Sequence, residues 1–435
     1  MLNRRRTKIG PFVKLRHRSS VNLVYDVSHT ALGRSVSAMS ATPPPPRTSS
    51  AGGSQRWNYL DQMRAILMLI GIPYHVGLIY ATHAPWIIDS PDKSEGLTWA
   101  LQFSHTFRMS VFFLLAGFFG MLMIRRYDAS TWLKGRLWRV GVPLVAALVL
   151  ISPMIVIPTA IGQGGWDNAI PGLLAAMRNP DLNWTVHLWF LMYLLGYCVL
   201  LAGLWQLRGP LRLERGLNMF LDAVERHPVV GWLAVLATGV ASVGFAGVAA
   251  LAGVSYMFNE IFVPGQFVAY GLVFLAGTLL AYRLSWLEAF TRPRWSIWAL
   301  AVASAITMAV FQPQEDDASR LLTYFLWPMV GILFSHLLLS AARMWLDRST
   351  SLSRAMVEGA MTMYLVHVVF VCWLGLAFLS VEWPAMVEFT IISVAAVALS
   401  WGFHLIVRRS PVLMMLFNGR ASLPAAHGRL STATS

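Results

Sequence analysis

Residues 60–80 read LDQMRAILMLIGIPYHVGLIY, a stretch apolar enough for a lipid bilayer that nevertheless carries Asp61, Arg64 and His75. In an α-helix, the rise of about 1.5 Å per residue separates Arg64 from His75 by about 16 Å, roughly half of the hydrocarbon layer. Asp61, one turn before Arg64, can pair with it on the same face. The stretch therefore predicts a membrane helix with an ion pair at its mouth and an imidazole deep inside. The plainer alternative is that Arg64 contacts lipid phosphate and His75 bonds a carbonyl.

The rest of the chain has the composition of a membrane protein. Of its 435 residues, 56% are hydrophobic and only 12% are charged, whereas about a quarter are charged in a soluble domain. Ten apolar segments are too long and too continuous for barrel strands, so they are expected to be helices. They cover residues 65–81, 102–123, 140–160, 187–207, 229–250, 266–282, 296–311, 321–341, 357–378 and 386–407. We therefore predict an all-α fold, a polytopic bundle of about ten transmembrane helices.

The chain divides into three regions by composition. Residues 1–55 are basic and rich in Pro and Ser, without a long apolar run, and are predicted to be a disordered arm. Residues 56–410 form a single membrane domain, because no gap between apolar segments could hold a soluble domain. Residues 411–435 are expected to be a cytoplasmic C-terminal tail.

Basic residues are distributed asymmetrically along the chain. Nearly all of the 34 Lys and Arg lie in the arm, the tail and alternate connections, whereas the other connections hold only Lys93, Arg178 and Arg320. The positive-inside rule then predicts that both termini are cytoplasmic. Topology and contact with anionic lipids account for the net charge of +14, so no nucleic-acid partner is expected.

The second apolar segment carries its own buried charge. His105 and Arg108 lie three residues apart near its outer end, and an apolar run follows at once. A buried guanidinium requires an anion. Two interpretations are open, a structural ion pair with Asp89, Asp92 or Glu95, or a contact with a ligand.

Three further polar clusters lie within the apolar segments or at their ends. They are Arg136 with Arg139, His187 with Trp189, and Tyr364 with His367. Taken singly, these clusters are also typical of topology charge, an interfacial aromatic belt and packing. No metal site is expected, because the histidines are scattered and the two cysteines, Cys198 and Cys372, lie apart in apolar runs.

Several of these motifs occur in a familiar order. Arg64 followed by ten residues and His75, FFxxxGF in the second segment, RxxRxxxP, HLWFL, YLVH and the closing SPVLMMLFNGR together resemble the acyltransferase-3 family of integral membrane acyltransferases. The resemblance is greatest to the subgroup that succinylates osmoregulated periplasmic glucans. It covers residues 57 to about 420. One departure is Val368, where that subgroup often has a second histidine after YLVH.

The resemblance implies an enzyme of the bacterial inner membrane. Its donor substrate would be a cytoplasmic acyl-CoA, with succinyl-CoA as the expected donor and no bound cofactor, and its acceptor a hydroxyl of a periplasmic glucan. Other glucan-biosynthesis proteins are expected partners. The family's essential histidine and its paired arginine match His75 and Arg64.

Acyl transfer chemistry then suggests roles for the residues. A neutral imidazole can remove the proton of a sugar hydroxyl, which makes His75 the expected general base. Arg64, held by Asp61, would attract the phosphates of coenzyme A together with Arg136 and Arg139. Arg108 would bind the succinyl carboxylate or the oxyanion. Substrate-binding roles are expected for the remaining residues, His105, His187, Trp189, Tyr364 and His367.

Two other functions fit intramembrane charges. A secondary transporter of a small anion or sugar is the main alternative, although no internal repeat or matched pair of broken segments is evident. A structural subunit would tolerate alanine at every polar position. This last reading is disfavoured, because each charge at membrane depth costs about 2.5 kcal/mol or more.

Overall fold

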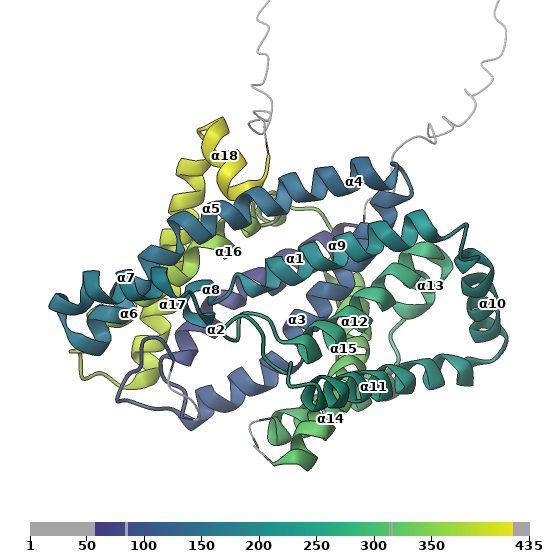
Figure 1. The fold of residues 1–435 in the computed structure, drawn as a ribbon, viewed down its shortest axis with the longest axis horizontal. Helices are drawn as coiled ribbons and strands as arrows, with labels where there is room; N and C mark the ends of the chain where they lie inside the picture. The colour runs from purple at the N-terminus through teal and green to yellow at the C-terminus, as the bar shows by residue number, and fades with distance from the viewer. Residues whose placement is uncertain (1–56, 83–85, 313, 315, 421–435) are drawn as a thin grey trace, which may run out of the picture. The chain divides into compact units, whose positions relative to one another are not determined.

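The computed structural model describes residues 57–82, 86–312, 314 and 316–420. The predicted N-terminal arm lies outside these residues. Within them, every regular element is a helix, and the only β-type pairing is an isolated bridge between Met257 and Phe262 (Figure 1). The all-α prediction is therefore confirmed for the part of the chain that the structure describes.

Long apolar helices make up most of the structure. Eight stretches of the described chain are long and apolar enough to cross a membrane. They are α3 (Glu95–Ile124), α4 to α6 (Ala129–Gly164), α9 (Trp189–Leu207), α11 (Pro228–Leu251), α12 (Pro264–Tyr282), α15 (Asp317–Trp345), α16 (Ser351–Phe378) and α17 (Ala385–Val407). A ninth is counted if α13 (Leu284–Phe290) and α14 (Trp295–Phe311), bent by 80°, form one span. The expected membrane bundle is thus present.

The first predicted segment is helical but broken. It comprises α1 (Asn58–Leu69) and α2 (Gly71–Leu78), which meet at Ile70. Pro73 explains the break, because it lacks an N–H and its ring clashes with the carbonyl four residues earlier, that of Leu69. This pair is not among the eight or nine candidate spans. Asp61, Arg64 and His75 lie in this pair of helices, and their polar side chains lower its mean hydropathy.

The span Ala129–Gly164 is also irregular. It consists of α4 (Ala129–Arg136), the π-helix η1 (Leu137–Gly141), α5 (Val142–Leu150) and α6 (Ser152–Gly164). Single π-helical turns inside α-helices occur frequently at functional sites. Here the π-helical turn contains Arg139 and begins directly after Arg136.

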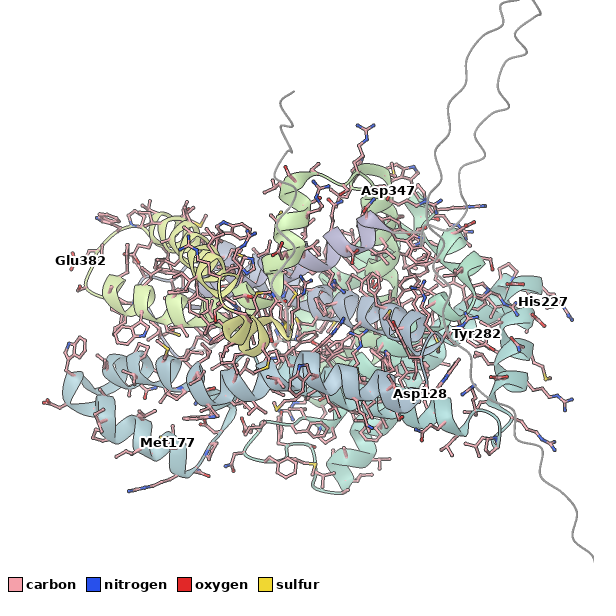
Figure 2. The ribbon with its side chains drawn as sticks, turned by 90° about the horizontal axis from the view of Figure 1, so that it is seen from above. Asp128, Met177, His227, Tyr282, Asp347 and Glu382 are labelled. Atoms are coloured by element: carbon pink, nitrogen blue, oxygen red, sulfur yellow. The ribbon has the colours of Figure 1, made fainter. Side chains whose placement is uncertain are left out.

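Short helices lie between the spans or, in the case of α18, after the last span. They are η2 (Trp166–Asn168), α7 (Ala169–Arg178), α8 (Leu182–Thr185), α10 (Leu213–Arg226) and α18 (Pro411–Asn418). Arg283 ties α10 to the end of α12, since its Nη1 lies 2.8 Å from Asp222 and 3.0 Å from Glu225. The hydrogen bond from Arg283 lowers the pKa of the Glu225 carboxyl, which lies at the surface. Asp128 and His227 lie at helix N-termini, away from the interior of the bundle (Figure 2).

The centre of the bundle is formed by α3, which packs against α12 and α15. Two glycines allow the backbones of α3 and α12 to touch. A Cβ on Gly117 would lie 2.0 Å from the carbonyl oxygen of Phe274, and one on Gly277 would lie 1.9 Å from that of Leu114. Small residues permit such close crossings in membranes, where packing rather than hydrophobic burial holds helices together. The crossing fixes the position of α3, which carries Arg108.

Candidate active site

A cavity of about 180 Å³ lies between α1, α2, α3, α9 and α16. Its wall contains seven of the residues singled out from the sequence, namely His75, His105, Arg108, His187, Trp189, Tyr364 and His367. The volume is below the roughly 300–1,000 Å³ of sites that enclose a drug-sized ligand. The cavity is therefore large enough for part of such a ligand but not for all of it.

One face of the broken first helix forms part of this wall. Met68, Gly71 and His75 line the cavity. They follow Arg64 at spacings of four, seven and eleven residues, which place all four on one side of a helix. At Gly71 no side chain separates the backbone from Arg108, whose Nη1 would lie 3.9 Å from an added Cβ. The sequence pattern did not single out Gly71.

His75 contacts a second imidazole from a distant part of the chain. Its Nδ1 lies 2.7 Å from the carbonyl oxygen of Gly71 and 3.0 Å from Nε2 of His367. His367 is fully buried, and its own Nδ1 lies 2.7 Å from the carbonyl oxygen of Tyr364. Among the described residues, Nε2 of His75 has no hydrogen-bond partner.

His187 completes a group of three imidazoles. The ring centroids of His75, His187 and His367 lie 5.0 to 6.1 Å apart. His187 Nε2 lies 3.2 Å from the carbonyl oxygen of Leu365, whereas its buried Nδ1 has no partner in the described chain. The carbonyl of His187 accepts a hydrogen bond of 2.5 Å from Tyr364 Oη. In the described residues, no group of three or more His, Cys, Asp or Glu is arranged to hold a metal ion.

The backbone just before His187 is strained. Val186, which also lines the cavity, has φ of 38° and ψ of −94°. A β-branched residue at positive φ is a steric outlier, and such strain costs about 1–3 kcal/mol. It persists only where the surroundings impose it, and it concentrates at functional sites. The imposed turn presents both the ring and the carbonyl of His187 to this cluster.

Within the part of the chain that the structure describes, Arg108 is buried without a counter-ion. Its side chain is 6% exposed, and its Nε and Nη1 have no hydrogen-bond partner among the described residues. The guanidinium carbon lies 3.8 Å from the ring centroid of Tyr74, so a cation–π contact is its main protein interaction. An unpaired buried guanidinium is costly. As a residue of the cavity wall, Arg108 therefore has two N–H donors that no acceptor of the described chain satisfies.

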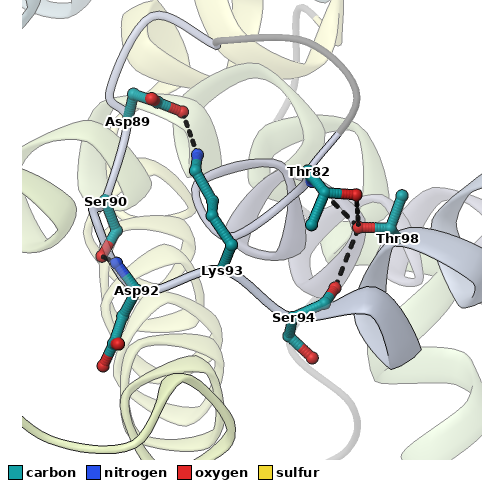
Figure 3. A network of polar contacts seen from close by, with 7 residues as sticks. All are labelled: Thr82, Asp89, Ser90, Asp92, Lys93, Ser94 and Thr98. Atoms are coloured by element: carbon teal, nitrogen blue, oxygen red, sulfur yellow. Dashed lines mark hydrogen bonds and ion pairs between the residues drawn. The ribbon is translucent and has the colours of Figure 1, made fainter.

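This arrangement corrects one expectation. The ion pair of Arg108 with Asp89, Asp92 or Glu95 is wrong, since no ion pair of the described residues involves Arg108. Asp89 pairs with Lys93 instead, and Asp92 N–H bonds Ser90 Oγ at 3.2 Å (Figure 3). The Asp89 carboxylate is thus paired within its own loop, and none of the three predicted carboxylates pairs with Arg108 in the described chain.

The same loop helps to close the cavity. Ser90 N–H bonds the carbonyl of Ile79, and Ser94 N–H bonds that of Tyr80. Thr82 Oγ1 bonds Thr98 Oγ1 at 3.2 Å, which attaches the loop to α3 (Figure 3). These bonds hold the described part of the loop, including Trp86, whose ring lies 5.9 Å from that of His75. Trp86 is a cavity residue that the sequence reasoning missed.

His105 also lines the cavity but is already bonded. Its Nδ1 lies 3.1 Å from Tyr74 Oη. Tyr74 therefore contacts both His105 and Arg108, and it links α2 to α3. Tyr74 was not predicted as a site residue, although it directly precedes His75 in the sequence.

The remaining predicted residues lie outside the cavity. Asp61 and Arg64 form the expected pair, with 3.4 Å between Oδ1 and Nη2. Arg136 stacks over Trp132 at 5.6 Å. The guanidinium groups of Arg136 and Arg420 lie close enough to that of Arg64 for their positive charges to repel it. The basic residues of the sequence prediction thus form a second group, separate from the imidazoles.

The start of the predicted tail is folded against this group. Asn418 Nδ2 donates to the Glu358 carbonyl at 3.0 Å, and α18 packs on α5 and α16 (Figure 1). Gly419 has φ of 65°, and a Cβ there would lie 2.2 Å from the carbonyl oxygen of Arg139. Only glycine allows this approach, so the turn after α18 brings Arg420 beside the π-helical turn.

The cavity has a definite hydrogen-bonding character. The guanidinium of Arg108 offers donors, and two imidazole nitrogens, Nε2 of His75 and Nδ1 of His187, have no partner in the described chain. A complementary ligand carries a carbonyl or carboxylate oxygen for the arginine and a hydroxyl proton for an imidazole. An acyl group beside an alcohol has both.

Comparison with known proteins agrees with this chemistry. The model of a family described as "Acyltransferase domain" matches residues 57–405. Proteins named "Glucans biosynthesis protein C" from Escherichia coli O81 (strain ED1a), Escherichia coli (strain K12) and Shigella dysenteriae serotype 1 (strain Sd197) are each 29% identical over 384 residues. The alignments cover 84% of this chain and 95% of each relative. No solved structure matches the chain.

Proposed function

Because this chain belongs to the acyltransferase-3 family and is a multi-pass membrane acyltransferase, we propose that it transfers a succinyl or similar small acyl group from a cytoplasmic acyl-CoA to hydroxyls of a periplasmic glucan. The proposed location is the bacterial inner membrane. The shared name of the relatives supports a glucan acceptor.

The unpaired Arg108 beside His75 carries the proposal. A succinyl group ends in a carboxylate, and a buried guanidinium without a counter-ion is suited to bind it. The same donors could instead face the oxyanion formed at the thioester carbonyl. Both uses fit a cavity that holds Arg108 and His75 together and that, in the described residues, contains no lining carboxylate.

His75 is the proposed general base. Its Nε2 removes the proton of the acceptor hydroxyl as the hydroxyl oxygen attacks the thioester carbonyl. The new C–O bond forms as the C–S bond breaks, and the imidazolium returns the proton to the departing sulfur, so that coenzyme A leaves as a thiol. The unpartnered Nε2 supports this role.

Donor binding is assigned to the cytoplasmic group. Arg64 and the neighbouring Arg136 and Arg139 would hold the phosphates of coenzyme A, with Asp61 positioning Arg64. From there, the face of the first helix that carries Met68 and Gly71 runs to His75. The pantetheine arm would follow this face, so its thioester reaches the cavity while the nucleotide stays outside.

The glucan acceptor is assigned to the side of the three imidazoles that lies away from the proposed coenzyme A site. Trp189 and Trp86 would offer aromatic surface to a sugar ring, and His187 lines the same wall of the cavity. Tyr364 and His105 already bond protein groups, so their contribution is to shape the wall.

Mass spectrometry of periplasmic glucans tests the acceptor and the acyl group together. Cells with the gene should contain glucans heavier by one acyl unit per modified hydroxyl than cells without it, and the mass increment names the acid. Purified protein should release free thiol from succinyl-CoA only when glucan is added. Succinate transport without thioester cleavage would instead support the carrier interpretation.

A further inference from the structure

The protonation of His367 follows from its backbone neighbours. Its Nδ1 lies 2.7 Å from the carbonyl oxygen of Tyr364 and 3.2 Å from that of Met363. A carbonyl oxygen only accepts hydrogen bonds, so Nδ1 carries the proton. A neutral imidazole has one N–H, and Nε2 of His367 is therefore an acceptor.

The protonation of His75 follows in turn. Its Nδ1 faces two acceptors, the Gly71 carbonyl at 2.7 Å and Nε2 of His367 at 3.0 Å. The opposite tautomer would set lone pairs against each other at both contacts. His75 thus holds its proton on Nδ1, and its Nε2 presents a lone pair to the cavity.

We propose that His367 is a positioning residue for the general base, a neutral imidazole that orients His75 and stabilises the charge that His75 gains. The inference rests on the proposed role of His75. Base and nucleophile pairs are commonly oriented by a third group, which is often a carboxylate. Here the third group is uncharged.

Arg108 explains why an imidazole fits this place better than a carboxylate. His367 and Arg108 line the same cavity of about 180 Å³. A carboxylate at position 367 would offer Arg108 a counter-ion, and the guanidinium would no longer be available to an anionic substrate group. An imidazole accepts the hydrogen bond from His75 without supplying negative charge. The two functions of the cavity, proton removal and anion binding, can then coexist.

Three variants of the full-length protein in detergent or nanodiscs test the proposal. His367→Gln places an amide oxygen near the lost Nε2 and keeps an acceptor for His75. His367→Met fills the space without an acceptor of comparable strength. His336→Met is the matched control, because His336 is also a buried span histidine bonded to a carbonyl, that of Phe290, but lies outside the cavity.

The assay measures thiol release from acyl-CoA in the presence of glucan, with kcat and KM determined separately. His367→Met should lower kcat by about 100-fold, the scale of general-base assistance, and should change both KM values less than about threefold. His367→Gln should recover at least about tenfold of that loss. His336→Met should keep kcat within about threefold of the wild type.

Other outcomes of the same assay would contradict the proposal. Equal losses for His367→Gln and His367→Met, or a loss confined to KM, would overturn the positioning role. If His367→Met fails to accumulate as a monodisperse protein, His367→Leu takes its place in the same comparison. A wild-type protein that cleaves no acyl-CoA contradicts the proposed function itself, whereas a wild type active only with acetyl-CoA changes the donor and leaves the test of His367 intact.

Discussion

Replacing Arg108 by glutamine should weaken acyl transfer from succinyl-CoA, whose acyl group carries a negative charge, more than transfer from acetyl-CoA. If the guanidinium binds the distal carboxylate of a succinyl group, the substitution removes a charge-assisted hydrogen bond worth about 1.5–3 kcal/mol. That energy corresponds to a loss of about 10- to 100-fold in kcat/KM for succinyl-CoA. Acetyl-CoA has no distal carboxylate, so its kcat/KM should change by less than about threefold.

The measurement is initial-rate thiol release with both donors, for the wild type and Arg108→Gln. Equal losses with the two donors would refute the carboxylate assignment and indicate an oxyanion role, because every acyl donor forms that oxyanion. Arg343→Gln is the matched control. Arg343 donates to Thr291 Oγ1 at 2.7 Å, away from the cavity, and should not affect donor choice.

Replacing Arg108 should also change the stability of the protein. An arginine at membrane depth costs about 2.5–3.5 kcal/mol on insertion scales, and its cation–π contact with Tyr74 returns about 2 kcal/mol at most. Arg108→Leu should therefore stabilise the protein by about 1 kcal/mol while abolishing succinyl transfer. A lower melting temperature of this variant in detergent would show that Arg108 has a partner that stabilises the fold.

Three further substitutions probe other parts of the site and fold. His75→Ala should leave membrane insertion intact and lower acyl transfer by at least about 100-fold, and normal levels of modified glucan in cells carrying it would refute the base assignment. Val186→Gly relieves the positive φ, so it should raise the melting temperature and lower kcat as His187 gains freedom; unchanged values of both would contradict imposed strain. Gly277→Val should force α12 from α3 at Leu114 and destabilise the protein by about 1–3 kcal/mol or more, visible as reduced accumulation and melting temperature.

Much of the helical framework could be predicted from hydropathy alone. All ten predicted segments overlap helices of the structure, because in hydrocarbon an apolar segment must satisfy its own backbone hydrogen bonds. The break at Ile70 and the π-helical turn at Arg139 could not be placed, since both depend on how local backbone bonds are redistributed. The cytoplasmic position of the termini stays a prediction.

The candidate site was predicted as a set of residues but not as an arrangement. His75 and His367 are 292 positions apart, and nothing in either segment indicates that the other will contact it. The expectation that Arg108 needs an anion was physically sound, yet the anion is not a nearby carboxylate of the described chain. Sequence spacing also could not show that Arg64 and His75 belong to separate groups, because both lie in one predicted segment.

The backbone contacts of α3 bear on how the two substrates meet. Gly117 is held against α12, and a Cβ on Gly331 of α15 would lie 2.7 Å from the Cβ of Ser110, only two residues from Arg108. Because α3 is held on both sides, the backbone that carries Arg108 has little reorganisation left to undergo when negative charge appears. Such an anchored helix is unsuited to rocking between two open states, so under the proposed function the thioester and the sugar would each travel to it.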